Sequence, residues 1–310
     1  MRIAILDSGV DKNIIKVEAG MNFVNNRSED YYDENGHGTC CASLIKYLCP
    51  QANLFPVKIL NGNLLSSSSI LINALEYLLD EDKIDIVHMS LSTPLNSDKL
   101  SKIIKKLKDR GIILISSYSN NKSIESFPAQ YGTTIGVMGS LFERDQYWFD
   151  LSAMTAVCNK IPSFALSRSG HYVLFSGNSK AAALFTGLIS QNNKDNVLSL
   201  KKIVDGAVRT DWSSDELISD INEVISKDED KNFYYLAGVV SDFLNCDSEK
   251  VLRGESLFQN GLTPYNAFSL LRTIEQVYDI KLNPFAVDAR FLWNINGLNA
   301  MINNRYGEEP

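Results

Sequence analysis

The stretch IDIVHMSLSTPLNSDKLSKIIKKLKDRGIILIS, residues 84 to 116, decides the fold class. It opens with an apolar run at 84–91, continues with apolar positions at helical spacing over 98–110, and returns to an apolar run at 112–116. Continuous apolar strands that alternate with helices are typical of a parallel sheet with both faces covered. The stretch therefore predicts an α/β fold whose functional groups collect at the carboxyl edge of the strands.

The same alternation of strands and helices extends toward the N-terminus. Toward the C-terminus the composition and the predicted secondary structure change. Apolar strands are predicted at 2–6 and 54–60, with a helix at 69–80, so we expect one α/β domain over residues 1–212. Residues 213–232 are polar and acidic, which predicts a linker or a surface helix. Residues 233–310 then form an all-helical module, with predicted helices at 233–245, at 264–279 opening with Pro264, and at 294–303.

Composition excludes several classes of protein. The chain has 310 residues, is 45% hydrophobic and carries a net charge of −7, so it is globular and offers a nucleic-acid partner no electrostatic support. No apolar run reaches transmembrane length, and the N-terminus lacks a secretion signal, so we expect a cytoplasmic protein with no membrane partner. The five cysteines are odd in number and lack zinc-type spacing, which favours buried free thiols and no metal or cofactor.

Three residues at element boundaries carry the chemistry. Asp7 lies in ILDSGV after the first strand, His37 in NGHGTCCASLI, and Ser179 in SGNSKAAA at a predicted helix start. Taken singly, the aspartate is also a turn former and the serine a helix cap. Together they supply a nucleophile, a base and a carboxylate that orients the base. Of the rival bases, His88 lies inside an apolar strand and His171 in a polar turn.

Glycine flanks two of these residues. We expect the glycines around His37 and before Ser179 to let a peptide substrate approach closely.

Over residues 1 to 210 these motifs resemble the subtilisin-like serine proteases, whose triad follows the order Asp, His, Ser. The resemblance implies a three-layer α/β fold with a mostly parallel sheet, and a catalytic triad of Asp7, His37 and Ser179. HMSLS at 88–92 is similar to the strand that pairs with the substrate backbone. ISSYSN at 115–120 is similar to the strand that leads to the oxyanion-hole asparagine. The resemblance thus assigns the oxyanion role to Asn120 and substrate binding to Ser90, Leu91, Ser92, Ser117, Tyr118 and Ser119.

The chain departs from the family pattern at positions that leave the triad intact. The departures are Asn178, Lys180 and Ala183 around the nucleophile, and Ser92 and Ser119 in place of two glycines. They leave the substrate preference and the catalytic rate open. Asn121 beside Asn120 leaves the oxyanion assignment open by one position. No carboxylate cluster suggests the family's calcium sites, and Asp7 comes so early that we expect no N-terminal propeptide.

The helical module resembles an acyl carrier protein over residues 236–282. In that family a serine at the start of the second helix carries phosphopantetheine, and here Pro264 takes its place beside an out-of-register Thr263. Proline has no hydroxyl, so the resemblance implies a carrier-like bundle without its cofactor. The alternatives are a docking domain and a plain helical bundle that packs on the protease.

This combination is similar to proteases that remove leader peptides from ribosomally made, bacteriocin-type modified peptides. We therefore expect a serine endopeptidase whose precursor-peptide substrate is recruited by residues 233–310. Two alternatives stay open: a macrocyclase that resolves the same acyl-enzyme with an amine, and a catalytically inactive peptide-binding scaffold.

Overall fold

A computed structural model of the chain describes residues 1–24, 27–142, 144–191, 198–208 and 231–304. The predicted acidic linker at 213–232 therefore lies outside the described residues as far as residue 230. The chain divides into two compact units, which are described separately below. Unit 1 comprises Met1–Lys160, Leu166–His171 and Ser176–Trp212, and unit 2 comprises Ile161–Ala165, Tyr172–Phe175 and Ser213–Pro310.

Unit 1 is built on a sheet whose eight strands, counted over the described ranges, run in the order β2-β3-β1-β4-β5-β6-β8-β7. All neighbouring pairs are parallel except β7 and β8, which confirms the predicted α/β fold with a mostly parallel sheet. The strands are β1 (Arg2–Asp7), β2 (Met21–Asn22), β3 (Asn53–Lys58), β4 (Ile86–Met89), β5 (Ile113–Ser117), β6 (Ile135–Ser140), β7 (Trp148–Asp150) and β8 (Thr155–Asn159).

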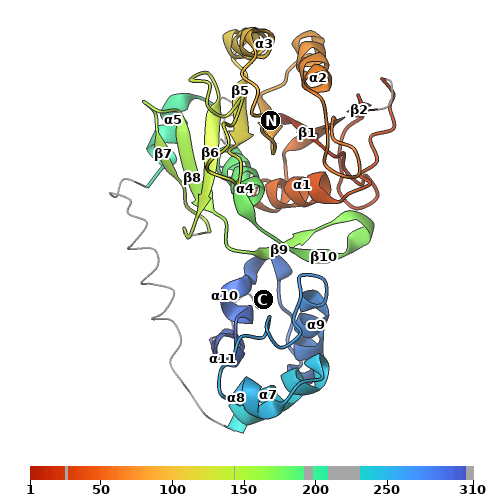
Figure 1. Cartoon of the computed structure of the whole chain (residues 1–310), viewed down its shortest axis with the longest axis vertical. Coiled ribbons are helices and arrows are strands. Elements are labelled where there is room, and N and C mark those ends of the chain that lie inside the picture. Colours follow the sequence, from red (N-terminus) through yellow and green to blue (C-terminus); the bar gives the residue numbers. More distant parts are fainter. Residues whose placement is uncertain (25–26, 143, 192–197, 209–230, 305–310) are drawn as a thin grey trace. The chain divides into compact units, whose positions relative to one another are not determined.

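Helices cover both faces of this sheet (Figure 1). One face carries α2 (Ser68–Asp80) and α3 (Asp98–Asp109), and the other carries α1 (His37–Leu48) and α4 (Gly177–Gln191). A short helix, α5 (Leu200–Gly206), packs near β7. None of the helices in the described ranges combines the length and the apolar character needed to cross a membrane.

The strand register decides which side chains face α1 and α4. Leu6, Val87 and Met89 belong to the apolar cluster formed with α2 and α3. Because side chains alternate along a strand, Asp7 and His88 point to the opposite face. The polar side chains of β1 and β4 therefore lie on the face that α1 and α4 cover.

Unit 2 is helical and includes two strands that come from the middle of the chain. These strands, β9 (Ser163–Leu166) and β10 (Tyr172–Phe175), form a two-stranded sheet, whose residue Leu166 and 3₁₀ turn at Arg168–Gly170 are counted with unit 1. A second 3₁₀ turn lies at Pro284–Ala286, and the helices are α7 (Lys231–Leu244), α8 (Ser248–Leu252), α9 (Ala267–Tyr278), α10 (Ala289–Leu292) and α11 (Ile295–Asn303).

The core of unit 2 draws on β9 as well as on the helices. Phe164 is fully buried in the cluster that also contains Leu236 and Leu270. The ring centroids of Phe164 and Phe268 are 5.8 Å apart, and those of Tyr172 and Phe268 are 4.8 Å apart. Residues 161–165 and 172–175 thus fold with the helices, which the sequence pattern did not indicate.

One predicted helix boundary is wrong. The helix expected to open at Pro264 begins at Ala267. The Thr263 N–H donates to Asn266 Oδ1 at 2.6 Å, and the Asn266 N–H donates to Thr263 Oγ1 at 3.2 Å. This reciprocal pair closes a turn before the helix and delays its first residue.

Candidate active site

The predicted catalytic residues gather at the carboxyl edge of three neighbouring strands. Asp7 ends β1, Ser90 follows β4, and Asn120 follows β5. Leu6 lies opposite Met89, and Met89 opposite Ser116, so these strand ends are at the same level in the sheet. Parallel strands therefore bring residues that are far apart in sequence to one edge.

Asp7 and His37 form a direct pair. The distance from His37 Nδ1 to Asp7 Oδ1 is 2.7 Å, and the same carboxylate oxygen accepts the Ser8 N–H at 2.7 Å. A carboxylate only accepts, so the shared proton lies on Nδ1, and Nε2 is left as the basic nitrogen. Asp7 is fully buried, whereas the His37 side chain is 15% exposed. The base is thus reachable, and the group that orients it is not.

The electrostatic surroundings favour the charged form of His37. Burial alone lowers the pKa of an imidazole, because it disfavours the imidazolium. Here the negative charge and hydrogen bond of Asp7, with a contribution from Asp33, outweigh burial, so the pKa of His37 is raised above its ordinary value. The pair is suited to accept a proton and hold it.

Ser179 is presented in the first turn of α4. Its hydroxyl lies 3.5 Å from the Ser90 carbonyl oxygen, a distance at the limit of a hydrogen bond. Gly177 opens the helix with φ of 84°, and a Cβ atom there would lie 3.0 Å from Asn120 Oδ1. Only glycine meets both conditions without strain. The helix start therefore brings Ser179 to the edge that holds Asp7 and Asn120.

The glycines beside His37 have an internal explanation. A Cβ atom on Gly36 would lie 2.3 Å from Ser167 Oγ, and one on Gly38 would lie 2.1 Å from the Gly9 carbonyl oxygen. The φ of 104° at Gly36 and the backbone contact at Gly38 require glycine at both positions. The prediction that these glycines make room for a substrate is therefore not needed to account for them.

Asn120 is fixed by the residues before the nucleophile. Its Oδ1 accepts the Asn178 N–H at 3.0 Å, which leaves its amide hydrogens as the donor side of the group. Asn121 instead closes a local turn, because its Oδ1 accepts the Ser123 N–H at 3.0 Å. Of the two adjacent asparagines, only Asn120 has its amide held against the segment that carries Ser179.

Asn178 joins three backbone segments around the nucleophile. Its amide nitrogen donates to the carbonyls of Tyr118 and Ser119, both at 3.0 Å, and its Oδ1 accepts the Gly139 N–H at 2.8 Å. This departure from the family pattern is therefore a structural link between the ends of β5 and β6. The sequence shows the unusual residue at position 178 but gives no indication of its hydrogen bonds to Tyr118, Ser119 and Gly139.

The predicted substrate-binding residues differ in what their backbones already bind. The Tyr118 and Ser119 carbonyls are taken by Asn178, and their N–H groups donate to the Val137 carbonyl and Ser126 Oγ. On the β4 side, no described residue hydrogen-bonds the backbone of Ser92. The other predicted members, Ser90, Leu91 and Ser117, lie at the ends of the same two strands.

The rival histidines lie in other surroundings. His88 is fully buried, with its Nδ1 2.9 Å from Thr186 Oγ1, as a hydrogen-bonded core residue should be. His171 is exposed beside the 3₁₀ turn of the β9–β10 hairpin. All five cysteines are free and four are buried, which confirms the predicted free thiols.

One group of side chains in the described ranges has metal-ligand spacing. It consists of Asp7, His37 and Cys41, whose ligand atoms lie within 4.8 Å of one another. Burial and the nearby Asp7 charge hold the pKa of the Cys41 thiol well above its ordinary value, so the sulfur is protonated at neutral pH. His37 Nδ1 is already bonded to Asp7, and a metal here would disrupt that pair. The prediction of no metal cofactor stays a prediction.

The fold and this edge define an α/β protein of the subtilisin-like class. A model of the subtilase family matches residues 1–199, so the chain belongs to the subtilase family. It is 27% identical to Subtilisin E of Bacillus subtilis over 205 residues, which cover 60% of this chain and 54% of that protein. It is 26% identical to Subtilisin of Bacillus pumilus over 205 residues, covering 60% of this chain and 74% of that protein. The chain thus spans about half the length of Subtilisin E.

Proposed function

We propose that this chain is a serine endopeptidase that uses Ser179, His37 and Asp7. The observation that carries the proposal is the 2.7 Å bond between His37 Nδ1 and a fully buried Asp7, at the sheet edge where α4 presents Ser179. Such a pair holds an imidazole in the tautomer that can take the proton of a hydroxyl. The relatives named above include proteins called subtilisins, which supports the same activity.

In the proposed mechanism Ser179 Oγ attacks the scissile carbonyl and its proton passes to His37 Nε2. The imidazolium is stabilised by Asp7 and then protonates the leaving amine. Water, activated by the same histidine, hydrolyses the acyl-enzyme. The Asn120 amide and the Ser179 N–H donate to the oxyanion, an arrangement supported by the bond that orients the Asn120 side chain.

The substrate is held as an extended strand along Ser90 to Ser92. The backbone of Ser92 has no partner among the described residues and is therefore available to a peptide. Tyr118 and Ser119, whose backbones are engaged, form a side wall of this site with Ser117.

The substrate class is a ribosomally made precursor peptide, and the cleavage removes its leader. The helical unit is a carrier-like bundle that recruits this peptide and carries no phosphopantetheine, since Pro264 takes the place of the modified serine. A hollow of about 390 Å³ lined by Phe233, Tyr234, Glu249, Leu252 and Arg253 supports a peptide-binding role for this unit. Five reduced thiols suit a cytoplasmic site of action.

Incubation of the full chain with candidate precursor peptides, followed by mass spectrometry, tests this proposal. Hydrolysis gives two fragments whose summed mass exceeds that of the peptide by one water, and Ser179→Ala gives none. Products whose summed mass equals that of the intact peptide, with no water added, show that an amine resolved the acyl-enzyme and point to cyclisation of the acyl fragment. Binding without cleavage by the unmodified chain indicates a scaffold and contradicts the proposal.

A further inference from the structure

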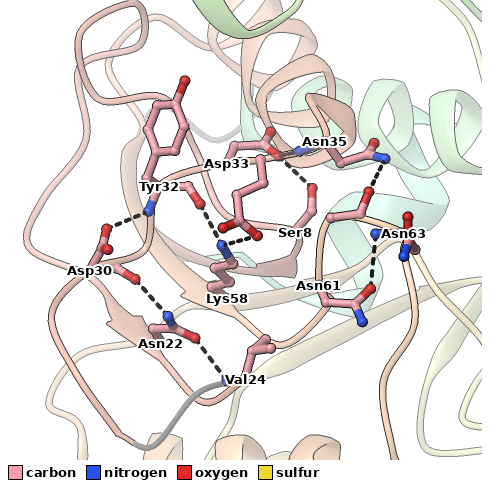
Figure 2. A network of polar contacts seen from close by, with 12 residues as sticks. Ser8, Asn22, Val24, Asp30, Tyr32, Asp33, Asn35, Lys58, Asn61 and Asn63 are labelled. Carbon is pink, nitrogen blue, oxygen red and sulfur yellow. Dashed lines mark hydrogen bonds and ion pairs between the residues drawn. The ribbon is translucent and has the colours of Figure 1, made fainter.

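Asp33 is a fully buried carboxylate that the proposed mechanism does not use. Its Oδ1 accepts hydrogen bonds from Ser8 Oγ at 2.9 Å, from the Asn35 N–H at 3.0 Å and from the Gly36 N–H at 2.7 Å. Its Oδ2 accepts both the N–H and the hydroxyl of Thr39, at 2.9 and 2.6 Å. Figure 2 shows Ser8 pointing at this carboxylate. Five donors on one carboxylate occupy both of its oxygens, so the buried group is fully hydrogen-bonded.

These bonds fix the start of α1, whose first residue is His37. The residue before it, Gly36, has no side chain to cap the helix. The free N–H groups of the first turn are satisfied from outside: that of His37 by Asn35 Oδ1, that of Gly38 by Ser8 Oγ and that of Thr39 by Asp33. Asp33 therefore acts as a remote cap that holds the backbone of His37.

The same carboxylate also reaches Asp7 through Ser8. The Ser8 hydroxyl has one proton and two carboxylate neighbours, Asp33 at 2.9 Å and Asp7 at 3.3 Å. The shorter distance assigns the proton to Asp33. With its side chain anchored in this way, Ser8 donates its backbone N–H to Asp7 Oδ1 at 2.7 Å. One buried group thus positions both members of the Asp7–His37 pair.

The charge of Asp33 acts on His37 as well. Asp7 and Asp33 are the two anions that favour its imidazolium. Two other titratable groups near the imidazole, Cys41 and His88, are neutral at pH 7. Burial raises the pKa of the Cys41 thiol well above its ordinary value, and burial lowers the pKa of His88 to about 4. A change at Asp33 is therefore felt by His37 without compensation from these neighbours.

We propose that Asp33 is a positioning residue of the active site: through Thr39, Gly36 and Ser8 it holds His37 against Asp7, and its charge stabilises the imidazolium formed in the reaction. This inference rests on the proposed function for its catalytic meaning. The effect of Asp33 on the pKa of His37 can be measured without any catalytic turnover.

The primary test is the pKa of His37 by NMR titration of the full chain, whose three histidines keep the assignment simple. Asp33→Asn removes one of two nearby anions, so we expect the pKa of His37 to fall by several tenths of a pH unit. Glu34→Gln is the matched control. It removes the same charge one residue away, from an exposed side chain paired with Lys58 at 3.2 Å. An equal shift in both variants, or none in Asp33→Asn, would overturn the proposal.

The second test follows the pH dependence of inactivation by a fluorophosphonate. Neutral His37 is the reactive form, so in Asp33→Asn we expect the acid limb of the profile to move to lower pH. We also expect the plateau rate to fall at least about tenfold, because His37 is less well held. We expect Glu34→Gln to keep both the position of the acid limb and the plateau rate. If Asp33 only caps the helix and its charge does not act on His37, Asp33→Asn lowers the plateau rate without moving the acid limb.

Two further variants keep the test valid if Asp33→Asn fails to fold. Asp33→Glu keeps the charge, and we expect it to retain the acid limb. Ser8→Ala removes the bridge to Asp7 and leaves the charge, so we expect a lower plateau at an unchanged limb. Full reactivity of Ser8→Ala contradicts the positioning role. The chain could show the expected fall in the pKa of His37 in Asp33→Asn and still never be labelled by the fluorophosphonate. That result contradicts the proposed function and leaves the inference about His37 intact.

Discussion

The backbone N–H of Asn178 donates to the side-chain oxygen of Asn120 at 3.0 Å. This bond ties the proposed oxyanion donor to the residue that directly precedes the proposed nucleophile. With its oxygen occupied, the Asn120 amide presents its hydrogens as donors. One hydrogen bond therefore positions the Asn120 amide relative to Ser179, the two groups that would act on the same carbonyl in the transition state.

Asn120→Ala is expected to lower the inactivation or cleavage rate by about 100- to 1000-fold, the loss established for removal of the subtilisin oxyanion donor. Substrate affinity should change little, because this donor acts mainly on the transition state. The measurement is kcat and KM on a cleaved peptide. Asn121→Ala is the control and should keep full activity, since Asn121 closes a local turn. Equal losses in both variants would contradict the assignment.

Asn178→Ala is expected to affect stability and activity together. It removes two donors from the carbonyls of Tyr118 and Ser119 and leaves the Gly139 N–H without its acceptor. Loss of a partner for a partly buried polar group costs about 1–3 kcal/mol. Urea unfolding should report this decrease in the free energy of unfolding. An unchanged midpoint would show that Asn178 does not link β5 to β6.

The sequence predicted the sheet, and it indicated the motifs of the candidate triad, because both depend on local patterns. The continuous apolar run at 84–91 was sufficient to place β4, and the order of Asp7, His37 and Ser179 was sufficient to place their motifs. Asp33 was missed, because its burial and its hydrogen bond to Ser8, 25 residues earlier in the chain, cannot be read from the local pattern. A carboxylate inside the acidic stretch 28–35 resembles any solvated surface charge until burial is known.

The helical unit shows the same limit. Helix periodicity placed α7, α9 and α11, but Phe164 belongs to their core through a contact more than 100 residues along the chain, from β9 to α9. Nothing in a local pattern indicates such a pairing. Local turn chemistry at Thr263 and Asn266 likewise overrode proline as the first residue of α9.

Phe268 of α9 contacts the strand residues that fold with unit 2. Its ring packs against Phe164 and Tyr172, and β10 ends at Phe175, close in sequence to Ser179. Phe268→Ala is expected to destabilise unit 2 by about 1–3 kcal/mol and to slow labelling of Ser179. Tyr265→Ala is the control, because that side chain is 85% exposed. Thermal unfolding reports the stability of unit 2, and the rate of fluorophosphonate labelling reports the state of Ser179. A change in stability with an unchanged labelling rate would show that the strands around Phe268 do not influence the nucleophile.

His88 is expected to make stability fall in acid. Burial lowers its pKa from 6.5 to about 4, so between these values the unfolded chain binds a proton that the folded chain does not. The contribution is complete above pH 6.5 and is lost as the pH falls toward 4, by about 3 kcal/mol for a shift of this size. The raised pKa of His37 acts in the opposite direction, because its contribution is present below 6.5 and is lost as the pH rises through the folded pKa.

The comparison that isolates His88 is urea unfolding of the unmodified chain and of His88→Gln from pH 7 to pH 4. Thr186 Oγ1 donates to the Ala182 carbonyl at 2.8 Å, so His88 Nδ1 is the donor to Thr186, and its Nε2 has no hydrogen-bond partner among the described residues. Protonation would place a charge on that nitrogen. The variant should therefore lose less stability in acid, and parallel curves would refute the buried neutral state.

The most direct test of the account is fluorophosphonate labelling of the full chain, followed by mass mapping of the modified residue. We expect a single adduct on Ser179 that is absent from Ser179→Ala and strongly reduced in His37→Ala, while both variants remain folded. A folded chain that takes up no label, or takes it up at another serine, would contradict the assignment of Ser179, His37 and Asp7 as a working triad.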